Sequence, residues 1–315
     1  MDDSGSTVDR QEEQQSLVPE EIKDKWEREQ MKLKKQMILT DSGDIIKIMS
    51  CCHGKTSDNF LIGGVDISFV KGDNVNACAA LIVLNFPQLE VVYEDCQMIK
   101  LTAPYIPGFL AFREAYLLED MYNKLKKTQP QYVPQVIMVD GNGILHPRGF
   151  GLACHLGVLL DTPCIGVAKN LFQVDGIEND DDHQLKIKHL SKGGDTFELV
   201  GTSCKVLGKA LRSCDSAPNP IYISTGHKIT LDSAVELVYK CCKHRVPEPT
   251  RQADIKSREY LRVHFGSEHE EQKNKGKKKQ RTKTTKHSNT DCNPVGNVEE
   301  LFEDTNCCLF EGNDT

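Results

Sequence analysis

The chain has 315 residues, 38% of them apolar, and a formal net charge of -7, which is enough for one large α/β domain or two small ones. It contains no run of about 18 apolar residues and begins with the acidic, polar stretch MDDSGSTVDRQEEQQ, so we expect no membrane span, no secretory signal and a place inside the cell. Its 13 cysteines include three adjacent pairs and no CxxC spacing, which predicts free thiols, buried at Cys78 and Cys164, rather than a disulfide framework or a zinc site.

The two ends of the chain are polar and have little to bury. Residues 1–18 and 266–315 are therefore predicted to be disordered, on either side of a folded domain over 19–265. The tail contains the basic run QKNKGKKKQRTKTTKH, residues 272–287, with seven lysines, one arginine and no acid. The net charge argues weakly against a nucleic-acid partner, but this run is consistent with a solvated linker, a nuclear or nucleolar address, or a non-specific nucleic-acid arm.

The first expected element is a charged helix over 20–39 that carries the single tryptophan, Trp26. The globular part is expected to begin near Phe60. Three strands follow, FLIGGVDISFV, NACAALIVLNF and LEVVYEDCQMI, and their short links predict an antiparallel meander.

The pattern then changes. A helix is expected from about Pro107 to Lys127, followed by the continuous apolar strand VIMVD, which is typical of a parallel sheet. The remaining expected elements are the helix GFGLACHLGVLL, the strand TPCIGVAK, a polar excursion over 175–195, the strands FELVG, KVLGKALRS and PIYISTG, and the helices LDSAVELVYKCCKHR and PTRQADIKSREYLRVHF. This order predicts an α/β protein of the ribonuclease H-like fold, with a mixed central sheet flanked by helices.

Two acids stand on expected strands. Asp66 lies in the middle of the first strand, on the face opposite Val65 and Ile67, where a single acid usually faces solvent. Asp140 ends VIMVD, and ligand sites in open α/β sheets lie at the carboxyl ends of parallel strands.

Glu114 stands on the apolar side of an expected helix. At 100° per residue it lies on the centre line of an apolar stripe, whereas Glu119 and Asp120 point elsewhere. An acid in that place is costly unless it is protonated, paired with a basic side chain or bound to a cation. The stripe consists of Leu110, Leu117, Leu118, Met121 and Leu125.

Asp254 and Lys169 are ambiguous by themselves. Asp254 precedes Arg258 by four residues, so an ordinary helical salt bridge explains it, and a lysine such as Lys169 faces solvent by default. The four acids can nevertheless converge at one edge of the sheet. Oxygen ligands of this kind suit Mg²⁺ or Mn²⁺, which activate water and neutralise charge when a phosphodiester is cut.

Six blocks of the sequence resemble those of the endonuclease V family, in the same order and at the same spacing: GGVDISFVKGD, TAPYIPGFLAFRE, MVDGNGILHPRGFGLACHLG, GVAK, STGHK and RVPEPTRQAD. The resemblance covers roughly Trp26 to Phe265. It implies a ribonuclease H-like catalytic domain that depends on Mg²⁺, for which Mn²⁺ can substitute. It also implies cleavage at the second phosphodiester bond on the 3′ side of inosine, leaving 3′-hydroxyl and 5′-phosphate ends.

The resemblance also assigns catalytic roles. Asp66 and Asp140 match the principal metal ligands, and Glu114 and Asp254 match the other acids of the active site. Some family members carry histidine at the position of Asp254. Lys169 matches the lysine that approaches the reacting backbone.

The remaining implied residues bind substrate. Tyr105 matches the tip of a wedge that stacks where the strand is interrupted, and prolines on both sides stiffen the loop. The backbone of Gly108 and Leu110 matches the lining of the pocket for the displaced hypoxanthine. The full expected substrate-binding set is Pro104, Tyr105, Ile106, Pro107, Gly108, Leu110 and Gly141.

Three functions remain open at this point. The first is an inosine-specific endoribonuclease acting mainly on single-stranded RNA, and the second is a DNA repair endonuclease acting at deoxyinosine, or on DNA that contains a ribose. The third is a non-catalytic protein that binds inosine RNA. For each we expect a monomer without a membrane partner, in the cytoplasm with a nuclear or nucleolar pool.

Overall fold

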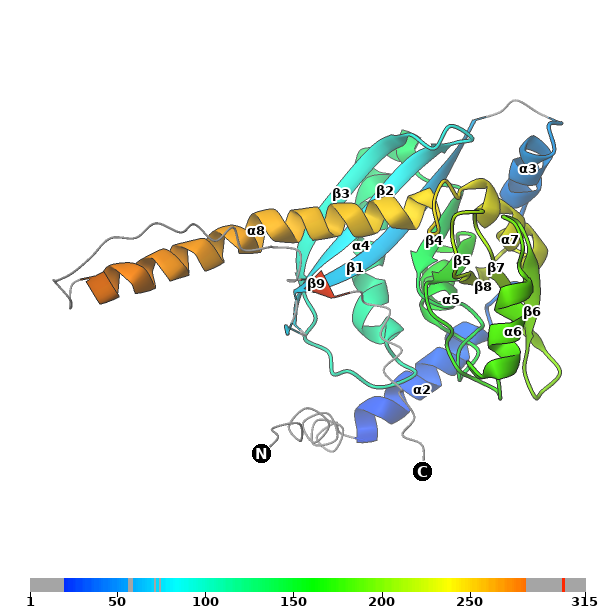
Figure 1. Cartoon of the computed structure of the whole chain (residues 1–315), viewed down its shortest axis with the longest axis horizontal. Coiled ribbons are helices and arrows are strands. Elements are labelled where there is room, and N and C mark those ends of the chain that lie inside the picture. Colours follow the sequence, from blue (N-terminus) through cyan, green and yellow to red (C-terminus); the bar gives the residue numbers. More distant parts are fainter. Residues whose placement is uncertain (1–19, 56–58, 71, 74, 282–301, 304–315) are drawn as a thin grey trace.

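A computed structural model describes residues 20–55, 59–70, 72–73, 75–281 and 302–303. Its strands form one mixed sheet in the order β3-β2-β1-β4-β5-β8-β7-β6, and β9 pairs with the end of β1 (Figure 1). β1 to β3 are antiparallel, whereas β4 and β5 run parallel to β1. The strands are β1 Phe60–Val70, β2 Asn76–Phe86, β3 Val91–Lys100, β4 Val136–Asp140, β5 Cys164–Ala168, β6 Thr196–Val200, β7 Val206–Leu211, β8 Ile221–His227 and β9 Phe302–Glu303.

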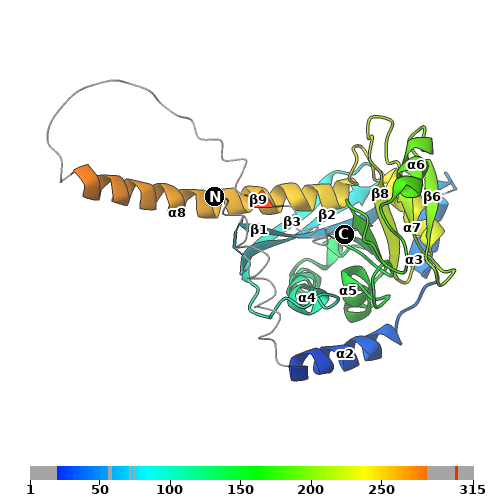
Figure 2. The same ribbon diagram turned by 60° about the horizontal axis from the view of Figure 1, so that its bottom comes forward.

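Helices cover both faces of this sheet. Figure 2 shows α8 on one side of β1 to β3 and α4 and α5 on the other, with α2 packed outside α5. The helices are α2 Glu20–Lys34, α3 Gly43–Cys52, α4 Ala111–Thr128, α5 Leu152–Leu160, α6 Asp181–His189, α7 Leu231–Lys240 and α8 Glu248–Arg281, with a short 3₁₀ turn at Pro130–Tyr132. The predicted fold, a mixed sheet flanked by helices, is confirmed.

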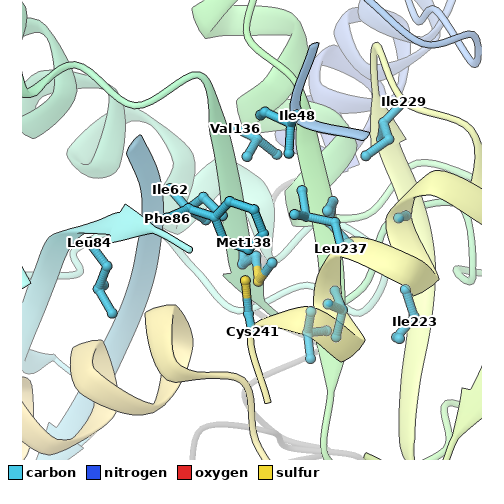
Figure 3. Packing of buried hydrophobic residues seen from close by; sticks show 14 of the residues in the cluster. Ile48, Ile62, Leu84, Phe86, Val136, Met138, Ile223, Ile229, Leu237 and Cys241 are labelled. Carbon is cyan, nitrogen blue, oxygen red and sulfur yellow. The ribbon is translucent and has the colours of Figure 1, made fainter. Parts of the chain in front are cut away.

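Side-chain alternation along β1 divides the core into two layers. Ile62 packs with Met138 and with Leu237 of α7 on one face, as Figure 3 shows, while Val65 and Ile67 pack against α4 and α5 on the other. Each fully buried aliphatic side chain of this kind contributes about 1.5–3 kcal/mol. β1 and β4 lie side by side between the two layers, and the candidate site lies at the middle of β1 and the carboxyl end of β4.

Two helices were not predicted. α3 begins at Ser42, whose side chain accepts a hydrogen bond from the backbone nitrogen of Ile45, and it buries Ile45 and Ile48. The folded part therefore starts before Phe60. α6 lies within the expected polar excursion. It is capped by Asp180, whose side chain accepts a hydrogen bond from the backbone nitrogen of His183.

The far end of the chain differs from the expected boundary at residue 265. α8 continues to Arg281, and β9 adds two residues beside β1. Lysine, glutamate and glutamine are good helix formers, so a polar sequence that buries little can still prolong a helix. The expected disorder of 1–18, and of most of 266–315, lies outside the described residues. No helix in the part of the chain described is long and apolar enough to cross a membrane.

Candidate active site

Asp66, in the middle of β1, lies beside Asp140, the last residue of β4. The parallel register pairs Val65 with Val139, so the residue that follows each of them occupies the same level. Asp66 is 4% exposed. Burial raises the pKa of this carboxyl, and the nearby charges of Asp140 and Asp254 raise it further. Asp66 therefore does not face solvent, as a lone strand acid usually would.

Lys169 follows directly after β5 and reaches two of the acids. Its ammonium nitrogen lies 3.1 Å from Oδ2 of Asp140 and 3.9 Å from Oδ1 of Asp254, and its side chain is 15% exposed. Burial works to lower the pKa of Lys169, but the neighbouring carboxylates outweigh it and the net pKa is raised. The lysine consequently stays charged inside the acidic cluster, which excludes the solvent-facing alternative.

Asp254 is brought to the cluster by α8. Its Oδ1 accepts a hydrogen bond of 2.8 Å from Nε of Arg258, so the helical salt bridge is present as well as the contact with Lys169. α8 approaches β1 closely because Gly64 has no side chain: a Cβ there would overlap the backbone of Pro249. Asp254 therefore contacts both Arg258 and Lys169.

Glu114 enters from the opposite face of the sheet, in the first turn of α4. It is 6% exposed, on the buried side of the helix as its spacing predicts. Burial raises the pKa of Glu114 to about 8; the adjacent guanidinium of Arg113 opposes the shift, while Asp66 and Asp140 add to it. Without a cation, Glu114 holds its proton at neutral pH.

The donor set fits a hard divalent cation. The pKa values of the buried carboxyls of Asp66 and Glu114 are raised by burial and, in part, by the charges of neighbouring acids, so a cation at Asp66 and Asp140 would relieve this repulsion. Within the described residues, no three acidic, histidine or cysteine side chains form a complete metal site. Mg²⁺ commonly binds through one or two carboxylates and completes its shell with water and substrate phosphate, which agrees with two protein ligands.

The loop before α4 places Tyr105 at the surface. Tyr105 is 47% exposed, between the buried Ile106 and the guanidinium of Arg113, which lies 5.9 Å from the centre of the tyrosine ring. Gly108 has φ +80°, a left-handed conformation that favours glycine. Leu110 immediately precedes the first turn of α4. The loop is thus joined directly to the helix that carries Glu114.

Gly141 follows Asp140 with φ +146°, and its nitrogen donates to the carbonyl of Val167 at 3.1 Å. This hydrogen bond ties the turn after β4 to β5. The substrate contacts expected for Gly141, and for Pro104 and Pro107 of the wedge, stay predictions.

Two supporting residues were not foreseen. Gln30 of α2 is 2% exposed and its amide nitrogen donates to the carbonyls of Gly108, at 3.1 Å, and Phe150, at 3.3 Å. Arg245 donates to the carbonyls of Lys169, at 2.5 Å, and Pro220, at 3.0 Å. The only sequence signal for Arg245 is its place at the start of RVPEPTRQAD, whereas Gln30 is one polar residue among many on a charged helix.

A family model described as Endonuclease V matches residues 47–255. This chain belongs to the endonuclease V family. Endonuclease V of Mus musculus is 53% identical over 248 residues, covering 79% of this chain and 72% of the mouse protein. Endonuclease V of Homo sapiens is also 53% identical over 248 residues, covering 79% of this chain and 86% of the human protein. The protein is accordingly an endonuclease, a hydrolase of nucleic-acid phosphodiester bonds.

Solved structures agree with the fold. The catalytic domain of human Endonuclease V superposes with a TM-score of 0.76 at 51% identity, over 79% of this endonuclease and 99% of that domain. Endonuclease V of Ciona intestinalis, solved in complex with a 24mer DNA containing an inosine followed by a ribo-adenosine, gives a TM-score of 0.68 at 34% identity, over 78% and 99% of the two chains. The family model begins at residue 47, so α2 lies outside the matched range.

Proposed function

We propose that this endonuclease cuts RNA at inosine, hydrolysing the second phosphodiester bond on the 3′ side with Mg²⁺ as cofactor and Mn²⁺ as a substitute. The observation that carries the proposal is the connection between the acidic cluster and the loop of Tyr105. Glu114 of the cluster stands only four residues after Leu110, the last residue before α4. α4 therefore acts as a spacer of fixed length between base recognition and cleavage.

Each side chain of the cluster has a role in this reaction. Asp66 and Asp140 would hold the cation, which lowers the pKa of a bound water and neutralises charge on the phosphate. Lys169, kept charged by the acids around it, binds the phosphate oxygens of the backbone. Burial raises the pKa of Glu114 in the absence of the cation, and a carboxyl at this place could exchange a proton with water. A water oxygen bonds to phosphorus and the P–O3′ bond breaks, leaving a 3′-hydroxyl and a 5′-phosphate.

Base recognition requires that inosine leave the stack, which costs a few kcal/mol. Tyr105, exposed on a loop bounded by prolines, can stack in the space the base vacates and recover about 1–3 kcal/mol. The backbone of Gly108 and Leu110 would then line the pocket for hypoxanthine. Gln30 donates a hydrogen bond to the Gly108 carbonyl, so this part of the loop is held in place without substrate.

The relatives leave a second candidate. The Ciona intestinalis protein is solved with DNA that contains inosine, which favours a DNA repair endonuclease acting at deoxyinosine. In that DNA the inosine is followed by a ribo-adenosine, so a ribose lies beside the base, as it does in RNA. The 2′-hydroxyl is the group by which a protein distinguishes RNA from DNA, and this supports the RNA proposal.

Three labelled strands of one sequence decide between these candidates: inosine RNA, deoxyinosine DNA, and deoxyinosine DNA with one ribose beside the scissile bond. We expect Mg²⁺-dependent cutting of the RNA and of the strand with one ribose, and much weaker cutting of all-deoxy DNA. Cutting of all-deoxy DNA at a rate equal to that of RNA would refute the RNA assignment. Binding of inosine RNA without any cleavage would support the non-catalytic alternative, which the clustered acids argue against.

We propose a cytoplasmic enzyme with a nuclear or nucleolar pool, on the basis of the basic run 272–287 and the family. Neutralising the lysines of the run in a fluorescent fusion should remove the nuclear signal.

We also propose a monomer, and light scattering at micromolar concentration should give a mass near 35.3 kDa.

A further inference from the structure

One oxygen of Asp66 is contacted by two buried serine hydroxyls from different elements. Oγ of Ser68, on β1, lies 2.9 Å from Oδ2 of Asp66, and Oγ of Ser257, on α8, lies 3.0 Å from the same oxygen. The two hydroxyl oxygens are 2.7 Å apart. Ser68 is 1% exposed and Ser257 is fully buried. Both serine hydroxyls therefore lie at Oδ2 of Asp66.

The number of hydroxyl hydrogens limits how many hydrogen bonds the two serines can donate at once. Each serine has one hydroxyl hydrogen. When Asp66 is ionised, both hydrogens can point at Oδ2, and the carboxylate then has Oδ1 left for another partner. The backbone carbonyl of Asp254, three residues earlier on α8, is also 3.0 Å from the Ser257 hydroxyl, and it competes with Asp66 for the single hydrogen of Ser257.

The same serine sets the register of α8 on β1. Two contacts join the elements: Gly64 meets Pro249, and Ser68 meets Ser257. From Gly64 to Ser68 the strand advances four residues, about 13 Å. From Pro249 to Ser257 the helix advances eight residues, about 12 Å. The spacings match, so the helix runs along the strand in the same direction.

Asp66 and Asp254 lie between those two contacts and at nearly the same height. Asp66 is two residues past Gly64, about 7 Å along the strand. Asp254 is five residues past Pro249, about 8 Å along the helix. A shift of α8 by one turn would move Asp254 away from Lys169, and the contact between Ser68 and Ser257 opposes that shift.

We propose that Ser257, together with Ser68, is a positioning residue for the reaction. The two hydroxyls fix Oδ2 of Asp66 so that Oδ1 is directed to the cation, and Ser257 keeps Asp254 level with Asp66. This inference rests on the proposed function, because it takes Asp66 as a metal ligand. Residues that orient a metal ligand commonly change metal affinity by about 10- to 100-fold when they are removed.

The test compares Ser257→Ala and Ser68→Ala with Ser213→Ala in the full chain. Ser213 is a matched control, since it is 1% exposed and its hydroxyl has no hydrogen-bond partner within the described residues. Mn²⁺ binding is measured by electron paramagnetic resonance without nucleic acid, and cleavage of inosine RNA is titrated against Mg²⁺. We expect about 10-fold weaker Mn²⁺ binding and a higher Mg²⁺ requirement in both site variants, an unchanged KM for RNA at saturating Mg²⁺, and no change in Ser213→Ala.

Ser257→Thr keeps the hydroxyl and should restore Mn²⁺ affinity. If Ser257→Ala does not fold, Ser68→Ala and Ser257→Thr still test the inference. Wild-type Mn²⁺ affinity in Ser68→Ala and Ser257→Ala, even with a lower melting temperature, would overturn it, because the serines would then only fill the core. Full cleavage by Asp66→Ala would instead contradict the proposed function itself, so the two failures are distinct.

Discussion

The ammonium nitrogen of Lys169 lies 3.1 Å from Oδ2 of Asp140, at the carboxyl ends of two adjacent parallel strands. This contact holds a positive charge within the acidic cluster before any cation or phosphate is present. Arg245 holds the backbone carbonyl of the same lysine. In the proposed reaction, Lys169 would bind the negative charge of the phosphate while the acids bind the cation.

Asp140→Asn keeps the size of the side chain and removes its charge. We expect cleavage of inosine RNA in Mg²⁺ to fall by about 100-fold or more, the loss typical of removing one preorganised electrostatic contact, while RNA binding changes little. The measurement pairs single-turnover cleavage with filter binding in EDTA. Asp120→Asn is the matched control, because Asp120 is an exposed acid on α4. Equal cleavage by the Asp140 variant and the control would exclude Asp140 as a metal ligand.

Glu114 makes the stability of the metal-free protein depend on pH. Its folded pKa of about 8 is above the ordinary 4.5, so the folded state binds the proton more tightly than the unfolded state does. The stabilisation is complete below about pH 4.5 and is lost as pH rises through 8. In EDTA, the melting temperature of the wild type should fall between pH 5 and pH 8.

Glu114→Gln carries no titrating group at this place, so its melting temperature should fall less over the same range. Mg²⁺ should stabilise the wild type more at pH 8 than at pH 6, because it binds the ionised cluster. If the melting temperatures of the wild type and of Glu114→Gln in EDTA change equally with pH between pH 5 and pH 9, Glu114 is not the titrating residue.

Asp140 and Glu114 could be selected from sequence because each stands where the pattern predicts burial, whereas Asp66 stands on a strand face where a lone acid usually meets solvent, and its role came from the resemblance. An acid among apolar neighbours is visible without coordinates. The contact between Lys169 and Asp254 could not be predicted from sequence, because it depends on how α8 lies along β1. Gln30 was hidden for the same reason: it is one polar residue on a charged helix, and its burial depends on Gly108, 78 residues away in sequence.

α3 was missed although its signals are local. Ser42 is a good N-cap residue, and Ile45, Ile48 and Met49 recur at helical spacing. The helix is only 10 residues long, a length at which helical periodicity is a weak signal. The sheet order beyond β5 also needed the structure, because β8 joins β5 antiparallel and no periodicity encodes that direction.

Tyr105→Ala should weaken discrimination between inosine and adenosine. Loss of base stacking on an aromatic ring costs about 1–3 kcal/mol, so the ratio of kcat/KM for inosine over adenosine RNA should fall by about 5- to 150-fold. Tyr116→Ala is the matched control: Tyr116 is 42% exposed, against 47% for Tyr105, and lies on α4. An unchanged ratio in the Tyr105 variant would refute the wedge role, whatever happens to the overall rate.

Gln30→Ala should both destabilise the protein and loosen the proposed base pocket. The variant leaves the carbonyls of Gly108 and Phe150 without their donor and removes the acceptor for Nε of Arg148. Leaving such buried groups unpaired costs about 1–3 kcal/mol, which corresponds to a fall of about 2–10 °C in the melting temperature. The inosine-to-adenosine ratio of kcat/KM should fall as well, since Gly108 forms the proposed pocket wall.

The neighbouring Glu29→Ala is the control, because Glu29 is exposed on the same helix and its loss should change stability by less than about 0.5 kcal/mol. Melting curves and cleavage ratios measured on both variants separate the two effects. A Gln30 variant that melts earlier but keeps the wild-type ratio would limit α2 to a stabilising role. A variant with both wild-type values would show that these hydrogen bonds contribute neither to stability nor to recognition.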